Sequence, residues 1–320
     1  MLGFVIRRAA ISILMLVAAS ALVFAILRLL PGDPIITRLG ATAGANPEAI
    51  DQLRREAGLD DPILTQYLRW LGDIFTGDFG QSYFSQFSVT DLISRRIGPT
   101  LELTAISIVF ALLIAVPLAV FCSLRRGSWF DRAVTTGSTV GLALPQFVLG
   151  ILLILIFAVE LQWLPARGYI PFNEDPGENV RRMILPSLTL AIAAAPLILR
   201  YLRASMIEVL DSSYIRTAEG KGVPHRRVVI AHALRNALIP GLTMLGMVIG
   251  YTLGGVVIIE YVFGIPGLGS LAVESVFKRD YAVLQSVVLL ICALFILTTL
   301  LVDVLSEFLD PRLRTGRAHG

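Results

Sequence analysis

The stretch "EGKG" at residues 219–222 is the part of the sequence most like an enzyme motif, because it looks like a phosphate-binding loop. Such a loop reads Gly, four residues, then Gly-Lys-Ser/Thr; its backbone amides hold the phosphates and its hydroxyl binds magnesium. Here Ile215 stands where the first glycine is needed, and Gly222 follows Lys221 in place of the hydroxyl. The sequence contains no H-E-x-x-H and no G-x-S-x-G motif either. We therefore expect a chain that does not hydrolyse ATP and is not an enzyme.

The histidines and cysteines give no indication of a cofactor. His225 and His232 are seven positions apart and have no third ligand nearby, whereas a zinc site takes several such ligands. Cys122 and Cys292 each stand alone in an apolar run, which fits neither a disulfide framework nor a metal cluster. The glycines of "GIPGLG" at residues 264–269 do not have the spacing of a dinucleotide site. We expect this chain itself to bind no metal, nucleotide or other cofactor.

The composition is that of a membrane protein. Of the 320 residues, 55% are hydrophobic and 16% are charged, and the mean hydropathy is +0.75. Soluble domains carry about 45–50% apolar and about 25% charged residues. The formal net charge is only +3, so the position of the charges matters more than their sum. We expect the lipid bilayer as the surroundings and no nucleic-acid partner.

Six stretches are long and apolar enough to cross about 30 Å of hydrocarbon as helices. The first follows Arg7 and Arg8 and so resembles a secretory signal. Its apolar run exceeds the roughly 7–15 residues of a signal sequence, and no convincing A-x-A site follows, so we expect a retained anchor. The sequence predicts an all-α integral membrane protein with six transmembrane helices, at residues 9–30, 100–124, 134–161, 184–202, 238–259 and 282–305.

Basic residues are concentrated on alternate connections, and the richer set is expected in the cytoplasm. They occur near the amino terminus, at residues 125–132, at 203–235 and in the tail at 306–320. The long first connection, 31–99, is net acidic and too long to decide orientation. Both termini are therefore predicted to be cytoplasmic.

This topology predicts four parts of the chain. A structured, helical region outside the membrane follows the first span, and a cytoplasmic loop divides the remaining five helices. The parts are the amino terminus with the first span at 1–30, the extracytoplasmic region at 31–99, the five-helix transmembrane core at 100–305 with its loop at 204–237, and a cytoplasmic tail at 306–320.

The outer region contains an apolar stripe at helical spacing. Such a stripe packs on the helix bundle or lies at the membrane surface, and it carries no ligand chemistry. Its members are Ile63, Leu64, Tyr67, Leu68 and Leu71.

The spans carry their charged residues near their ends, which argues against a proton- or ion-coupled carrier, because such carriers need buried ionisable groups. Prolines at 117, 145 and 196 fall in mid-span, where they would kink helices and free backbone carbonyls. They either shape the bundle only, or Pro145 and Gln146 line a pathway.

The stretch "EYVFGIPGLGSL" suits a compact outer re-entrant turn, because its glycines and proline permit sharp changes of direction. This turn would help to close a gate or to receive cargo, and a plain structured loop is an equal alternative. The residues concerned are Gly264, Pro266, Gly267 and Gly269.

The segment at residues 211–240, called the basic segment below, is predicted to form two helices with a sharp corner. A side chain at residues 211–213 can cap the first helix, Gly222 can end it in a left-handed conformation, and Pro224 prevents its continuation. The second helix, over about 225–238, is predicted to bury one broad face made of Val228, Val229, Ala231, Leu234 and Leu238.

Two interpretations of the basic segment compete. Its basic residues would be attracted to anionic lipid at the membrane surface. However, the corner carries the small residues Ala218, Gly220 and Gly222 rather than anchoring aromatics. Small residues let another protein approach the backbone closely, so the pattern favours a protein-docking corner.

The pattern "YIRTA…KG…HALRNALIP" resembles the cytoplasmic loop of permease subunits of bacterial ABC importers, specifically the dipeptide/oligopeptide B-type permeases. Gly222 matches the glycine of the general E-A-A-x-x-x-G loop. Arg216-Thr217-Ala218 stands where E-A-A is usual, and the ending is "LIP" rather than I-x-L-P. The same family is indicated along nearly the whole chain by "LLPGDP", "GLDDPILTQYLRWL…GDFGQS", "ALPQFVLG", "VFGIPGLGSL", "RDYAVLQSVVLL" and "DPRLR".

The resemblance implies a type I ABC importer permease in the bacterial inner membrane, which forms its pathway with a second homologous permease. Two cytoplasmic ATPase subunits would hold ATP and magnesium, and an extracytoplasmic peptide-binding protein would deliver peptide cargo. The basic segment would be a coupling helix in an ATPase groove, with Ala218 or Gly222 at the contact. The coupling residues so implied are Asp211, Tyr214, Ile215, Arg216, Thr217, Ala218, Lys221, Gly222 and Arg235.

Two alternatives stay open from the sequence. The same architecture can import nickel chelates, glutathione or another small solute, because these motifs do not encode cargo. A different class, an ATP-independent secondary carrier or channel, is disfavoured by the charge-poor spans and the docking-type loop.

Overall fold

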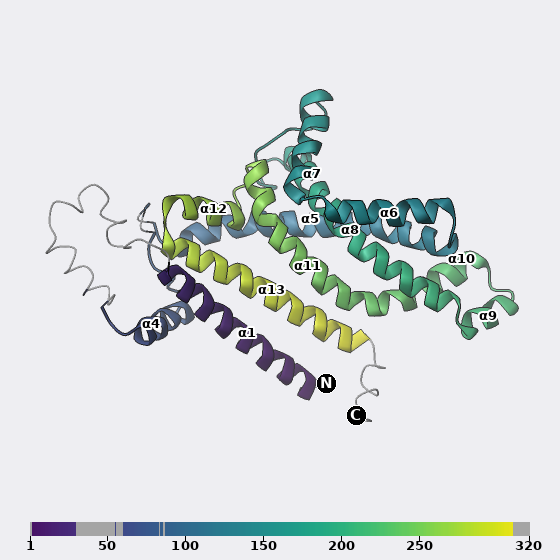
Figure 1. The fold of residues 1–320 in the computed structure, drawn as a ribbon, viewed down its shortest axis with the longest axis horizontal. Coiled ribbons are helices and arrows are strands. Elements are labelled where there is room, and N and C mark those ends of the chain that lie inside the picture. The colour runs from purple at the N-terminus through teal and green to yellow at the C-terminus, as the bar shows by residue number, and fades with distance from the viewer. Residues whose placement is uncertain (1, 30–54, 56–59, 83, 86, 310–320) are drawn as a thin grey trace. The chain divides into compact units, whose positions relative to one another are not determined.

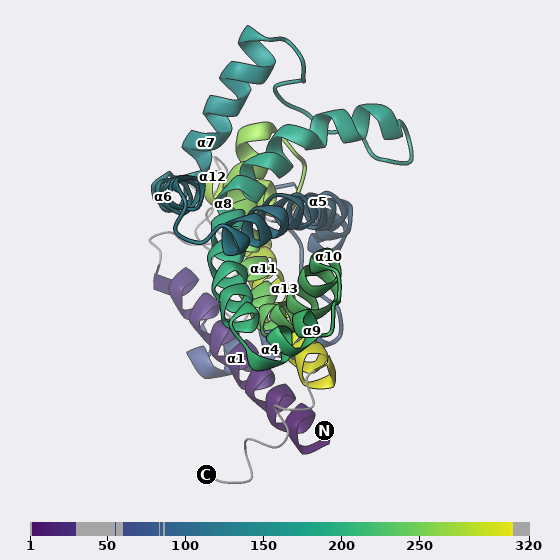
Figure 2. The same ribbon diagram turned by 90° about the vertical axis from the view of Figure 1, so that its right-hand side faces the viewer.

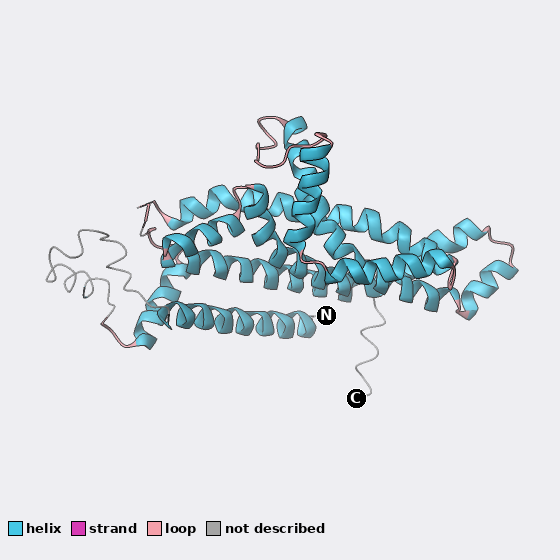
Figure 3. Cartoon of the chain, turned by 45° about the horizontal axis from the view of Figure 1, so that its top comes forward, coloured by secondary structure: helices cyan, strands magenta, loops and turns pink. Residues whose placement is uncertain are grey.

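The computed structural model describes residues 2–29, 55, 60–82, 84–85 and 87–309. Every regular element among these residues is a helix, and the β pairing found there is one isolated bridge between Gln81 and Ser88 (Figure 3). The helices in chain order are α1 (Leu2–Leu29), α4 (Ile63–Phe75), α5 (Val89–Leu124), α6 (Trp129–Ala143), α7 (Gln146–Leu153), η2 (Ile154–Glu160), α8 (Pro176–Leu210), α9 (Ser213–Gly220), α10 (His225–Arg227), η3 (Val228–Leu234), α11 (Arg235–Phe263), α12 (Leu268–Lys278) and α13 (Tyr281–Leu309) (Figure 1). The all-α prediction is confirmed.

Five described helices are long and apolar enough to cross a membrane, and each corresponds to one predicted span. The remaining prediction, a single span at 134–161, falls on α6 and α7 with η2, which form a pair bent by 104°, so a span there stays a prediction. The five candidates are Gly3–Ile26, Val89–Leu124, Pro176–Leu210, Met244–Phe263 and Tyr281–Glu307, and the bent pair makes six if it counts as one span.

The bend lies at Pro145. Leu144 before it has an extended conformation (φ −79°, ψ 127°), because the proline ring disfavours the helical region for the preceding residue. Pro145 then acts as the N-cap position of α7, where its missing N–H costs no hydrogen bond. The other two mid-span prolines, Pro117 and Pro196, lie inside the continuous helices α5 and α8, so only one of the three expected sites interrupts a helix.

The chain divides into two compact units, which we describe separately. One comprises Met1–Ala9, Leu101–Ile265 and Leu297–Gly320 and is called the core unit. The other comprises Ala10–Thr100 and Pro266–Ile296 and is called the second unit. These two units do not correspond to the four predicted parts of the chain, and those parts remain predictions.

Helix α8 is the central element of the core unit. Its apolar window is 72% buried, and α8 packs against α6, α7, α11 and η3. Small side chains allow this close packing, as is usual between membrane helices, which lack a strong hydrophobic drive to associate. The buried small residues on α5 and α8 are Ala111, Ala115, Ala119, Ala191, Ala194 and Ala195.

The second unit has a separate apolar core. It is formed by the start of α5, by α12 and by the start of α13. In the same unit α4 packs on α1 through aromatic side chains. The buried members of the core are Val89, Ile93, Leu268, Leu271, Ala272, Val283 and Val287.

Candidate functional site

The basic segment connects the last turn of α8 to α11 and contains α9, α10 and η3 (Figures 1 and 2). The chain leaves α8 at Leu210, forms α9, turns through residues 221–224, and returns through α10 and η3 into α11 without a break. The predicted helix, sharp corner and second helix are confirmed.

Helix α9 starts at the predicted place but without the predicted side-chain cap. Ser212 is the N-cap residue, and its hydroxyl donates backwards to the Val209 carbonyl at 2.5 Å instead of accepting from α9. Asp211 forms an ion pair with Arg126 at 3.3 Å, in which both side chains are well exposed. Such a pair contributes little to stability, so α9 is held chiefly by its packing.

The corner after α9 depends on Gly222. Its φ of +75° lies in the left-handed region, which costs an L-residue with a side chain about 1–2 kcal/mol. The amide of Gly222 donates to the Glu219 carbonyl (2.9 Å), and the amide of Val223 donates to Ala218 (3.2 Å). These bonds satisfy carbonyls at the end of α9 in the manner of a glycine C-cap. The prediction for Gly222 is confirmed.

One face of α9 is anchored and the opposite face is open. Ile215 is 2% exposed and belongs to the apolar cluster of the core unit, against which Ala218 and Val223 also pack. Ala218 is half-buried and is directed more toward the core than toward the surface where an ATPase subunit is expected. Gly222 is exposed. The exposed residues of the corner are Tyr214, Arg216, Thr217, Glu219, Gly220, Lys221 and Gly222.

The second helix buries a different set of residues from the predicted one. Val228 and Val229 are buried as expected and Leu234 is half-buried, but Ala231 and Leu238 are exposed. The reason is η3, a π-helix whose i→i+5 hydrogen bonds rotate later side chains away from the α-helical register. Ala233 and Ala237 occupy the buried positions instead.

The start of α11 is linked to α9 by polar contacts. The Asn236 amide donates to the Tyr214 hydroxyl (3.1 Å) and to the His232 carbonyl (2.6 Å). Arg235, implied as a coupling residue, is exposed at the first position of α11. Helix α9 is therefore fixed to the returning helix at both its apolar and its polar side.

A buried ion pair supports the α8 end of the segment, and sequence reasoning missed it. Arg203 of α8 donates from Nε and Nη2 to the two Asp131 carboxylate oxygens, each at 2.6 Å. The Gly127 amide donates to the same carboxylate (2.9 Å), and Asp131 is 3% exposed. Bidentate charge-assisted bonds of this kind are strong and directional. They join the start of α6 to α8, about two turns before α8 ends at Leu210.

The proposed pathway residues lie at the bend between α6 and α7. Pro145 is exposed and Gln146 is half-buried, with its side chain directly against Gly255 of α11. A Cβ atom at Gly255 would overlap the Gln146 amide, so α7 and α11 approach here only because residue 255 is glycine. Nearby, Gly150 similarly allows Phe263 to approach α7.

The predicted outer turn begins in the core unit, where α11 ends and Gly264 is its C-cap residue with φ +65°. The preceding Phe263 carbonyl accepts a hydrogen bond from the Gly168 amide (2.8 Å). In the same loop the Tyr169 hydroxyl donates to Glu102 (2.8 Å). Burial, together with the hydrogen bond to the Glu102 carboxylate, raises the pKa of Tyr169, which favours the protonated hydroxyl that donates this bond.

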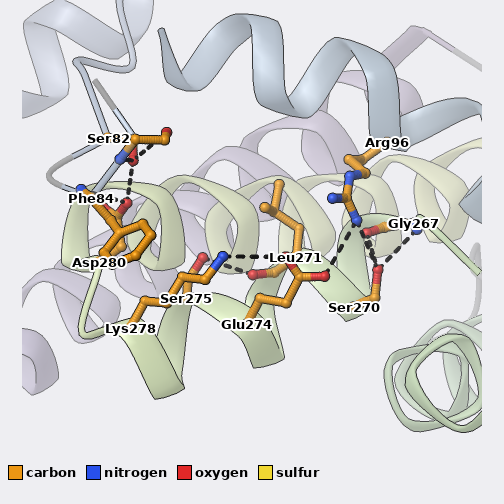
Figure 4. A network of polar contacts seen from close by, with 11 residues as sticks. Ser82, Phe84, Arg96, Gly267, Ser270, Leu271, Glu274, Ser275, Lys278 and Asp280 are labelled. Atoms are coloured by element: carbon orange, nitrogen blue, oxygen red, sulfur yellow. Dashed lines mark hydrogen bonds and ion pairs between the residues drawn. The ribbon is translucent and has the colours of Figure 1, made fainter. Parts of the chain in front are cut away.

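The second-unit side of the turn begins α12 after Gly267. The Gly267 amide donates to Ser270 Oγ (3.0 Å), and Arg96 of α5 also reaches that hydroxyl (3.3 Å). Figure 4 shows this network continuing from Arg96 to Glu274. Pro266 is half-buried and Gly269 is buried, so only one of these two positions is accessible. Hydrogen bonds hold both sides of the turn, and its role as a gate stays a prediction.

Comparison with known proteins identifies the family. Residues 115–315 match the model of the binding-protein-dependent transport system inner membrane component, and residues 1–104 match its amino-terminal counterpart. The chain is 42% identical over 314 residues to the glutathione transport system permease protein GsiC of Escherichia coli, covering 98% of this chain and 99% of that one. It is 37% identical over 311 residues to a probable peptide ABC transporter permease protein, y4tP, of Sinorhizobium fredii, covering 97% and 99%.

A solved structure supports the same fold. A chain of the MetNI methionine ABC transporter matches with a TM-score of 0.57 over 68% of this chain and 96% of that chain, at 19% identity. The predicted ABC importer permease fold is thereby confirmed. With the candidate spans and the family match, it identifies a multi-pass inner-membrane protein. The chain belongs to the family of inner-membrane permease components of binding-protein-dependent transport systems, the ABC importers.

Proposed function

We propose that this chain forms, with a second homologous permease, the pathway of an ATP-driven importer for di- or oligopeptides or glutathione. Relatives named as peptide and glutathione permeases cover almost the whole chain and support this cargo class. Glutathione is itself a small peptide, so the two names describe one chemical class. An extracytoplasmic binding protein would deliver the cargo, and nickel chelates are the next alternative.

Coupling to two cytoplasmic ATPase subunits would occur through the basic segment. The observation that carries this proposal is the two-sided character of α9: Ile215 anchors one face in the core unit, and the other face exposes polar and small residues. An apolar face would suit lipid, whereas this open face suits a protein groove. Both chain termini would then lie in the cytoplasm with α9, as the distribution of basic residues indicates.

Energy from ATP would reach the pathway through rigid contacts. The ATPases can shift the permease only by binding its two conformations unequally. A helix fixed by Ile215, by Asn236 and by the nearby Asp131–Arg203 pair can pass such a bias to α8 and α6. Helix α6 leads to the bend at Pro145 and Gln146, which we place at the pathway. ATP and magnesium would be bound by the partner subunits.

Purification from native membranes in mild detergent, followed by mass spectrometry, tests the assembly. We expect two ATPase subunits and a second permease to be recovered with this chain. Proteoliposomes containing that complex and the binding protein should take up labelled glutathione or dipeptide only when ATP is supplied to the ATPase side. A chain recovered alone that transports without ATP would show it to be a carrier or channel instead.

A further inference from the structure

Helix α4 of the second unit presents an apolar surface that the described residues of the chain leave open. None of its residues is buried, and four large apolar side chains are more than half exposed. Thr65, Arg69 and Asp73 occupy the opposite side of the helix, so the helix is amphipathic. The exposed apolar residues are Ile63 (68%), Leu64 (67%), Leu68 (57%) and Phe75 (82%).

The position of α4 is set by contacts with α1. Phe24 of α1 packs against Tyr67 and Trp70, with ring centroids 5.5 Å and 5.7 Å apart. The hydroxyls of Ser20 and Tyr67 share a hydrogen bond of 2.8 Å. Both α1 residues lie near the end of the candidate span Gly3–Ile26 (Figure 1). Helix α4 is therefore held at the level where α1 leaves the hydrocarbon.

The exposed face of α4 lies beside an apolar surface of α1 that suits lipid. The apolar window of α1 is only 17% buried, and Ile13, Leu14 and Leu22 are exposed on it. Leu64 and Leu68 lie on the flank of the α4 stripe beside the residues that contact α1. Tyr67 and Trp70, with apolar rings and polar tips, are the aromatic types enriched at the membrane–water boundary.

The charges of α4 indicate the lipid chemistry. Arg69 is paired with Asp61 at 2.8 Å, and Asp73 leaves this helix without net positive charge. Interfacial helices that bind anionic headgroups carry lysines and arginines on the polar face. Helix α4 therefore has the apolar area for the bilayer but no electrostatic preference for anionic lipid.

We propose that α4 is an interfacial helix, with Leu64, Leu68 and Phe75 inserted at the headgroup–acyl boundary of the leaflet into which the C-terminal end of α1 opens. On the orientation proposed above this is the outer leaflet. The helix fixes the start of the region before α5 at the membrane surface. The inference does not depend on cargo or on ATPase coupling.

Spin labels on the assembled complex test this proposal. In a Cys122→Ala, Cys292→Ala background, Leu68→Cys and the matched polar-face Asp73→Cys are labelled and reconstituted into phosphatidylcholine nanodiscs. We expect the Leu68 label to collide more with oxygen than with a water-soluble nickel chelate, and the Asp73 label to show the reverse. Replacing a third of the lipid by phosphatidylglycerol should leave both ratios unchanged.

Two results would overturn the proposal. A Leu68 label that is reached by neither reagent, and becomes accessible when the second permease is absent, would show that a protein covers this face. A Leu68 label with the same nickel accessibility as the Asp73 label would place α4 in water. Uptake measured on the same samples separates failure of this proposal from failure of the transport assignment.

Discussion

Helices α9 and α4 are both short and both lie beside a membrane span, yet they are held in opposite ways. Helix α9 inserts Ile215 into the core-unit cluster and leaves polar and small residues outside. Helix α4 buries no residue and leaves its large apolar residues outside. On the proposals above, the first would meet a protein surface in water, and the second would meet lipid.

The difference shows that the residues on the open face of a helix indicate what it contacts better than its overall hydrophobicity does. From the sequence, the basic segment could meet lipid or protein, with protein favoured, and the apolar stripe of α4 could meet the helix bundle or the membrane surface. The exposed side chains support protein in the first case and the membrane surface in the second. Adding bulk to the two faces should therefore have unequal consequences.

The largest effect is expected from Gly220→Trp on the open face of α9. Nothing lies within 4 Å of a Cβ atom at Gly220, so the chain itself tolerates the side chain, but an ATPase groove would not. Uptake by the reconstituted complex should fall by at least ~10-fold, equivalent to about 1.4 kcal/mol or more of lost coupling. Leu68→Trp on α4 is the matched control and should transport normally. Equal uptake by the two variants would remove the distinction between the helices.

The next largest effect is expected from Asp131→Ala, which removes the support beneath α9. Arg203 would lose its bidentate partner, and breaking a buried pair costs roughly 3–5 kcal/mol. Since Arg203 is partly exposed, we expect the lower end of that range, measured as reduced thermal stability in detergent. The exposed pair gives the control: Arg126→Ala should change stability by about 0.5 kcal/mol or less. Similar losses in both variants would contradict the role of the buried pair.

A smaller effect separates the two glycines of the corner. Gly222→Ala places a side chain at φ +75° and should destabilise the protein by about 1–2 kcal/mol. Gly220→Ala lies within α9 and should stabilise it by up to about 1 kcal/mol. Thermal unfolding of both variants, with uptake measured alongside, checks the sign of each change. Stabilisation by Gly222→Ala would mean that residue 222 does not keep its left-handed conformation when the protein is in a membrane.

The smallest effect is expected at the link between α4 and α1. Tyr67→Phe removes the hydrogen bond to Ser20 and should cost about 1 kcal/mol or less, because Ser20 keeps a second bond to the Val17 carbonyl. A double-mutant cycle with Ser20→Ala should show that the two substitutions are not additive. Additive losses would mean that the two hydroxyls do not interact.

The sequence predicted features that depend on neighbouring residues. Apolar length predicted the helices that span, and Gly222 with Pro224 predicted the corner after α9. Pro145 was expected to disturb a span, but proline alone does not determine the result, because Pro196 lies inside an unbroken α8. After the 104° bend α7 packs against α11, where Gly255 admits Gln146, and this tertiary contact is not visible in the local sequence.

Features that depend on distant residues could not be predicted. Asp131 and Arg203 lie on different helices, and nothing in the local pattern pairs them. The predicted buried face after His225 was wrong at Ala231 and Leu238 because a π-helix does not follow the α-helical period. The half-buried position of Ala218 likewise follows from the packing of α9 on the core, not from residue size.

Crosslinking from the open face of α9 tests the coupling assignment most directly. A photoreactive amino acid placed at exposed Thr217, in the complete complex in native membranes, should give adducts with an ATPase subunit identified by mass spectrometry. The yield should change when ATP is trapped without hydrolysis, and the same residue placed at Leu68 should give lipid adducts only. Lipid adducts from residue 217, with no ATPase product under either condition, would contradict the account.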